Sequence, residues 1–193
     1  MLSQIKQLNK IENFPSFTGE RVYMLPFKKQ TGLPKKLQRW QNIIDNILQY
    51  VKSDKFIFLM IDQSFVKAGT PQRRPGLHID GVWKPTLNTS ELDSYNTNKY
   101  IYAGGHDSKH SVINTSSETI LLISDILGCK AYAGTYQDIP REGGNCQHIS
   151  IDHLSSIPLL PNFVWQADNL TLHESLPVKK DCYRTLLRLN VQL

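Results

Sequence analysis

The sequence predicts a mainly β fold of the α+β type, a jelly roll of antiparallel strands flanked by an N-terminal amphipathic helix. The chain has 193 residues, which is the size of one domain. Short β-rich segments separated by Gly, Pro and Asn recur from residue 55 onward, a pattern typical of an antiparallel sandwich or barrel and not of a βαβ repeat. A jelly roll fits them economically, because its two facing sheets leave an open mouth for a binding site.

The N-terminal part, residues 1–55, is predicted to form an arm, a short strand and a supporting helix. Residues 1–17 are expected to be a loosely structured arm, and residues 21–25 a strand. Pro34 suits the start of a helix, since its missing N–H costs little at the first helical position. Apolar residues then repeat at helical spacing through about residue 52, and this wide stripe is expected to cover one face of a sheet.

The remaining residues, 56–193, are predicted to form the β core. Its expected strands cover residues 55–65, 77–82, 119–124, 130–136, 148–151, 162–166, 170–174 and 183–191. The polar stretch 83–118 is long for a connection, and such loops are usually functional lids or disordered segments. We expect a lid-like insertion whose Trp83, Tyr100 and Tyr102 pack on a substrate, with a structureless insertion as the alternative.

Composition and charge exclude several classes of protein. No stretch approaches the roughly 20 apolar residues that cross a bilayer, and no apolar leader follows Met1, so a cytoplasmic protein without a membrane contact is expected. The three cysteines lack CxxC spacing, which argues against a zinc knuckle and favours free thiols. The net charge of +5 is not clustered, so nucleic acid is permitted as a partner but not favoured.

His78 and Asp80 form an HxD motif on a predicted strand. Residues i and i+2 of a strand point to the same side, so both can bind one ion while Ile79 faces the core. The expected third ligand is His173, near the start of a strand that follows a turn at Asp168-Asn169. Two imidazoles and a carboxylate suit a divalent iron with open coordination positions. The alternative is a hydrogen-bonded His78 in a turn and a surface His173; the other four histidines are expected to be exposed or hydrogen-bonded.

The last predicted strand separates two faces. One face is almost wholly apolar and should be buried, whereas the other carries Arg184 and Arg188. If that second face points into the barrel, each guanidinium needs an anion, because an unpaired buried cation is very costly. Arginines close after the last candidate ligand suit a bound dicarboxylate, which the guanidinium fork matches bidentately.

The order His78-x-Asp80, His173 and Arg184 resembles that of the Fe(II)- and 2-oxoglutarate-dependent dioxygenases. In that family the HxD motif ends the second core strand of a double-stranded β-helix, a jelly-roll variant, the distal histidine starts the seventh strand, and the arginine lies on the eighth. The resemblance covers about residues 56–193. It implies that the first three residues bind Fe(II) and that Arg184 binds the distal carboxylate of 2-oxoglutarate, with Arg188 as a second candidate for the cosubstrate or an anionic substrate.

The activity that the resemblance implies is the hydroxylation of an unactivated C–H bond in a small molecule or amino-acid side chain. It would use O2 and 2-oxoglutarate and release succinate and CO2. The alternatives are an enzyme that modifies or demethylates nucleobases of DNA or RNA, a non-catalytic β-barrel binding module, and a cupin-like metal enzyme without 2-oxoglutarate. Arg73 and Arg74 lie just before the HxD motif and could attract an anionic substrate from the mouth, with surface placement as the alternative.

Overall fold

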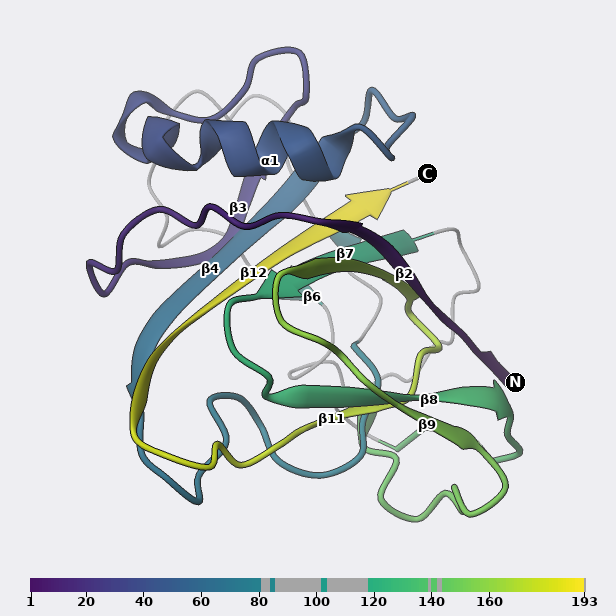
Figure 1. The fold of residues 1–193 in the computed structure, drawn as a ribbon. Helices are drawn as coiled ribbons and strands as arrows, with labels where there is room; N and C mark the ends of the chain where they lie inside the picture. Colours follow the sequence, from purple (N-terminus) through teal and green to yellow (C-terminus); the bar gives the residue numbers. More distant parts are fainter. Residues whose placement is uncertain (81–83, 86–101, 104–117, 139, 142–143, 193) are drawn as a thin grey trace.

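The computed structural model describes residues 1–80, 84–85, 102–103, 118–138, 140–141 and 144–192. The described part is mainly β, with two antiparallel sheets that face each other and one short helix (Figure 1). A third, two-stranded sheet pairs β5 (Lys84–Pro85) with β6 (Tyr102–Ala103). None of the helices in these residues is both long and apolar enough to cross a membrane.

The larger sheet has six strands in the order β2-β10-β7-β12-β4-β3. Their bounds are β2 Ile5–Lys10, β10 Phe163–Asp168, β7 Glu118–Ser124, β12 Cys182–Gln192, β4 Ile57–Val66 and β3 Arg21–Phe27. The last strand of the chain, β12, is central and pairs with β4 and β7. The helix covers one face of this sheet and the smaller sheet covers the other, so both the apolar face and the arginine face of β12 are removed from water. The exception is Tyr183 at its start, which is 63% exposed.

The helix packs across the outer face of this sheet. It begins as a 3-10 helix, η1 (Lys35–Trp40), and continues as α1 (Gln41–Leu48). The expected apolar stripe is confirmed and joins Leu187, Leu189 and other outward residues of the sheet in one hydrophobic cluster. The first turns wind more tightly than predicted, and this places Leu37 and Trp40, three residues apart, on the same buried side.

The smaller sheet lies on the opposite side of the six-stranded sheet from α1 (Figure 1). Its strands are β8 Cys129–Thr135, β1 Leu2–Ser3, β9 Ser155–Pro158 and β11 His173–Ser175, and β8 pairs with each of the other three. Ala131, Leu159 and Trp165 form a hydrophobic cluster that joins the two sheets at one end. The facing sheets therefore enclose an interior, and the charged residues of β12 project into it.

Three sequence predictions differ from the structure. Residues 1–17 are not a loose arm throughout, because β1 and β2 add to the two sheets through pairing with β8 and β10. Residues 148–151 form turns, and the strand of this region lies at 155–158, where β8 offers a free edge. Within the predicted strand 77–82, the described residues 77–80 do not form a continuous strand, because His78 makes isolated bridges only.

Candidate metal centre

Backbone pairing brings the two candidate histidine ligands together from distant parts of the chain. The amide of His78 donates to the carbonyl of His173 at 2.9 Å, and the amide of His173 donates to the carbonyl of His78 at 2.9 Å. This reciprocal pair is an isolated antiparallel bridge between His78 and the first residue of β11. It sets the two imidazole rings 4.3 Å apart, measured between centroids.

The segment before His78 is fixed by a glycine turn. Gly76 has φ +82°, a conformation that L side chains rarely adopt, and a Cβ there would also displace the end of the Gln147 side chain. The carbonyl of Gly76 lies 2.7 Å from Nδ1 of His78. Beyond His78, Ile79 is buried in a second hydrophobic cluster with Leu77 and Leu172, as expected for the residue between two ligands.

Both candidate histidines are oriented in the same way. Nδ1 of His173 lies 2.9 Å from the carbonyl of Thr171, which matches the contact of His78 with Gly76. A carbonyl oxygen only accepts hydrogen bonds, so Nδ1 must carry the proton in both rings. In the neutral rings the lone pair is then on Nε2, the arrangement that hydrogen-bonded metal ligands adopt.

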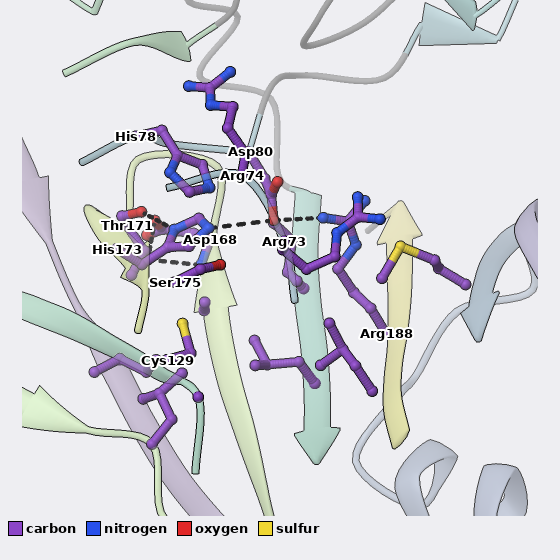
Figure 2. A pocket seen from close by; sticks show the side chains of 18 of the residues that line it. Arg73, Arg74, His78, Asp80, Cys129, Asp168, Thr171, His173, Ser175 and Arg188 are labelled. Atoms are coloured by element: carbon purple, nitrogen blue, oxygen red, sulfur yellow. Dashed lines mark hydrogen bonds and ion pairs between the residues drawn. The ribbon is translucent and has the colours of Figure 1, made fainter. Parts of the chain in front are cut away.

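The three predicted ligands form one cluster. One ligand atom from each of His78, Asp80 and His173 lies within 4.8 Å of the others. Figure 2 shows the three side chains turned toward one another, with Arg188 on the far side of Asp80. Two imidazole nitrogens and a carboxylate oxygen that converge in this way can hold a metal ion.

The carboxylate of Asp80 is held by a buried arginine. Nη1 of Arg188 donates to Oδ2 of Asp80 at 2.7 Å, and Nε2 of His173 lies 3.7 Å from the same oxygen. Arg188 is 8% exposed, and its Nε has no partner within the described residues. Burial by itself raises the pKa of Asp80, but the positive charge of Arg188 and the nearby histidines outweigh it, so the pKa falls well below the usual range.

Electrostatics keep His78 neutral. Burial is the main cause that lowers the pKa of His78 to about 4, and the neighbouring His173 adds to the effect. At neutral pH the site therefore combines an uncharged His78 with an ionised Asp80. These are the protonation states in which both groups can bind a metal.

Arg184 is almost fully buried and lies in the same interior. It is 1% exposed; its Nε donates to Ser124 Oγ at 3.0 Å and to the Ile126 carbonyl at 3.1 Å, and its Nη1 donates to Gln72 Oε1 at 2.7 Å. All of these acceptors are neutral. Within the described ranges no carboxylate lies within 4 Å of this guanidinium. Burial lowers the pKa of Arg184, yet an arginine stays charged in proteins.

One cavity, open to solvent on one side, connects these groups. Its lining includes the three candidate ligands and both arginines of β12. The apolar part of the wall is formed by Met60, Ile120, Leu122, Leu159 and Leu186. A mostly apolar cavity with a few convergent charged groups is the usual form of a small-molecule site.

The other predicted site residues have different outcomes. Arg73 and Arg74 line the cavity. The sequence left open whether they lie at the mouth of the site or elsewhere on the surface. Trp83 and Tyr100 lie outside the described residues, as does almost all of the 83–118 segment, and Tyr102 belongs to β6 with its side chain outside the description. The lid therefore stays a prediction. Elsewhere His148 and His153 are exposed, as expected.

Several cavity residues were missed by sequence reasoning. Thr171 and Ser175 lie two positions before and after His173, so the i, i+2 rule could have found them. Gln72, Ser124 and Gly128 surround Arg184 from three loops or strand ends. No sequence signal connects these positions, because their proximity depends on the way the sheets close.

Comparison with protein family models, curated proteins and solved structures found no match for this chain. The interpretation of the site therefore rests on its own geometry. That geometry includes a His-Asp-His cluster compatible with the site of a 2-oxoglutarate-dependent oxygenase.

Proposed function

We propose that this protein is an Fe(II)- and 2-oxoglutarate-dependent dioxygenase with a double-stranded β-helix core. Its reaction would hydroxylate an unactivated C–H bond of a small molecule or an amino-acid side chain. The observation that carries the proposal is that one cavity is lined by the His78-Asp80-His173 cluster and by the buried Arg184, which has no carboxylate partner among the described residues.

The donor set fits ferrous iron. Two neutral imidazoles and one carboxylate are the ligands with which non-haem Fe(II) oxygenases leave coordination positions open. Here His78 and His173 both turn Nε2 away from a backbone carbonyl, and Asp80 is ionised. A structural zinc site would instead require four ligands, and the described residues offer three in this cluster.

Arg184 is suited to bind the distal carboxylate of the cosubstrate. Burying a cation with only neutral partners costs free energy, and a charged ligand can offset that cost. Arg184 presents a guanidinium to the cavity, and a dicarboxylate can bind it at one end while its keto-acid end reaches the metal. Arg188 is less suited to this role in the described state, because Asp80 already occupies its Nη1.

The residues of the chain then have separate tasks. When bound, Fe(II) and 2-oxoglutarate supply O2 activation, and the overall reaction converts O2, 2-oxoglutarate and a C–H bond into succinate, CO2 and a C–OH group. Arg184 orients the cosubstrate through its far carboxylate, and Arg188 holds Asp80 ionised and in place. The apolar wall excludes water, which protects a reactive site from side reactions.

Anaerobic titration of the metal-free protein with Fe(II) and 2-oxoglutarate tests the proposal. The weak visible charge-transfer absorption of the iron–keto-acid chelate should appear at one equivalent of each. It should vanish in His173→Ala, which loses a metal ligand, and should require much more 2-oxoglutarate in Arg184→Ala. The exposed residues His153 and Arg141 give matched controls, so His153→Ala and Arg141→Ala should titrate like the parent protein.

Two results would contradict the proposal. One is the absence of the absorption in folded protein that has taken up Fe(II). The other is an absorption that Arg184→Ala leaves unchanged in position and in its 2-oxoglutarate dependence. Oxygen-dependent formation of succinate from 2-oxoglutarate, measured with the same variants, gives a second readout.

A further inference from the structure

Three aromatic side chains form an exposed cluster at one end of the larger sheet. Phe17, Phe65 and Tyr183 are 39%, 49% and 63% exposed. Tyr183 lies in the middle, because its ring centroid is 4.7 Å from that of Phe17 and 5.3 Å from that of Phe65. We call these three residues the aromatic cluster. Single exposed apolar side chains are ordinary, whereas a contiguous apolar patch rimmed by polar groups marks an interaction site.

The aromatic cluster lies on the opposite face of the larger sheet from the cavity. Tyr183 and Phe65 are cross-strand partners at the start of β12 and the end of β4, which lie side by side (Figure 1). The next pair on the same face, Thr185 and Gln63, is buried and separates them from the hydrophobic core under α1. Arg184 points to the other face, since neighbouring strand residues alternate. The cluster is therefore a surface of its own.

Phe17 is held in the cluster by the residues on both sides of it. The amide of Thr18 donates to Oε1 of Gln63 at 3.0 Å, and the carbonyl of Ser16 accepts a hydrogen bond from Nη1 of Arg39 at 2.9 Å. Gln63 is 1% exposed, so it holds this loop from a buried position. The rings are therefore ordered before a partner binds, and this lowers the entropic cost of binding.

Three lysines lie on the chain segments that border the aromatic cluster. Lys67 follows the end of β4, and Lys179 and Lys180 precede the start of β12. All three lysines are exposed, and none makes an ion pair with a carboxylate in the described part of the chain. Their charges are therefore available to an anionic partner.

The two segments that carry these lysines lie next to each other. The amide of Ala68 donates to Oδ1 of Asp181 at 2.8 Å, and the amide of Gly69 donates to the carbonyl of Val178 at 2.9 Å. Asp181 is the single acidic residue of segments 67–70 and 178–181, so three lysines against one aspartate leave two positive charges. The border of the aromatic cluster is thus basic.

We propose that the aromatic cluster and its three lysines bind an acidic segment of a partner protein, which places an apolar side chain on Tyr183. An apolar centre with a charged rim is the usual anatomy of a protein interface, and tyrosine is frequent among the residues that dominate binding. Complementary charge accelerates association and selects the partner.

Two other occupants fit the aromatic cluster less well. The rings of Phe17 and Phe65 are tilted by 54° and 60° relative to Tyr183, so the three rings do not offer parallel faces to successive bases of a nucleic acid. A second copy of this chain would set one basic border against another, and like charges across an interface oppose association.

Selection from a random peptide library displayed on phage tests the inference. The parent protein should enrich peptides in which Asp or Glu flank an apolar residue, and fluorescein-labelled copies of these peptides are then titrated by fluorescence anisotropy. Tyr183→Thr removes the ring but keeps a residue that suits a strand, and it should weaken binding about tenfold or more. Lys67→Glu/Lys180→Glu should weaken binding by a similar factor, and added salt should narrow its difference from the parent.

Matched variants make the same changes elsewhere on the surface. Tyr50 is exposed after the end of α1, and Lys35 and Lys36 are exposed neighbours on η1. Tyr50→Thr and Lys35→Glu/Lys36→Glu should bind the peptides like the parent, and thermal unfolding checks that every variant is folded.

Three results would overturn the inference. One is a selection that enriches no acidic peptides, and another is equal binding of the acidic peptides by Tyr183→Thr and the parent. The third is tighter binding of oligodeoxythymidine or of phosphatidylserine vesicles than of the peptides, which would assign the aromatic cluster to nucleic acid or to a lipid surface. The chelate titration tests the cavity separately, so neither proposal depends on the outcome of the other.

Discussion

Gly128→Ala tests the proposed role of Arg184 without replacing a charged residue. Gly128 does not have a positive φ, so its backbone accepts alanine. A Cβ at this position would lie 2.6 Å from Cζ and 2.8 Å from Nη1 of Arg184, whereas ordinary contacts begin at 3.4 Å. The guanidinium must therefore move by about 0.8 Å, the difference between 3.4 and 2.6 Å.

The displacement should weaken 2-oxoglutarate binding and leave metal binding intact. Nε of Arg184 now donates to Ser124 and Ile126 at 3.0 and 3.1 Å, and such a shift stretches these bonds beyond hydrogen-bonding distance. Losing one hydrogen bond of a charged group costs about 1.5–3 kcal/mol. If the binding free energy of the cosubstrate falls by that amount, the dissociation constant of 2-oxoglutarate rises roughly 10- to 150-fold.

The assay is the anaerobic chelate titration, with the dissociation constants of Fe(II) and of 2-oxoglutarate fitted separately. Leu127→Ala serves as the control, since it alters the adjacent, exposed side chain and should change neither constant. An unchanged 2-oxoglutarate constant in folded Gly128→Ala protein would refute the assignment of Arg184 to the cosubstrate. Equal weakening of both constants would show general damage instead.

Two further outcomes are expected. Arg188→Leu should destabilise the metal-free protein by about 3 kcal/mol in denaturant unfolding, because it leaves Asp80 buried without its partner. Added Fe(II) should recover part of the lost stability. If the variant and the parent protein were equally stable without metal, the ion pair would contribute nothing to stability. Burial raises the pKa of Cys129 to about 12 and of Cys146 to about 11, so both thiols stay protonated at pH 8 and alkylate slowly. Mass spectrometry should find Cys182 modified first, and early modification of Cys129 would contradict this order.

The alternating face of β12 shows what sequence patterns could predict. The alternation separates an apolar face from the face of Arg184 and Arg188, and only the nearby His173 favours an inward direction for the arginines; the structure buries both faces. The metal cluster could also be predicted, because the i, i+2 rule places His78 and Asp80 on one side and His173 lies on a later predicted strand.

The parts that the sequence did not predict depend on long-range pairing. The polar sequence of β2 predicts an arm, and this segment forms a strand only because it pairs with the edge of β10. His78 behaves as a strand residue through two isolated bridges, to His173 and to Asn145, although its neighbours do not continue the strand. The ion pair between Arg188 and Asp80 depends on how close β12 lies to the HxD segment, and no local sequence pattern predicts that distance.

The reciprocal hydrogen bonds between His78 and His173 link the metal centre to the folding of the chain. Each histidine already has its Nδ1 contact within two residues, but the two rings meet only after the segment at 76–80 has docked on β11. Closing the loop between residues 78 and 173 carries an entropic cost, so we expect the site to be assembled late in folding. An ion that binds it then fastens the two ends of this loop together, and amide hydrogen exchange at His78 and His173 would slow in proportion to the metal affinity.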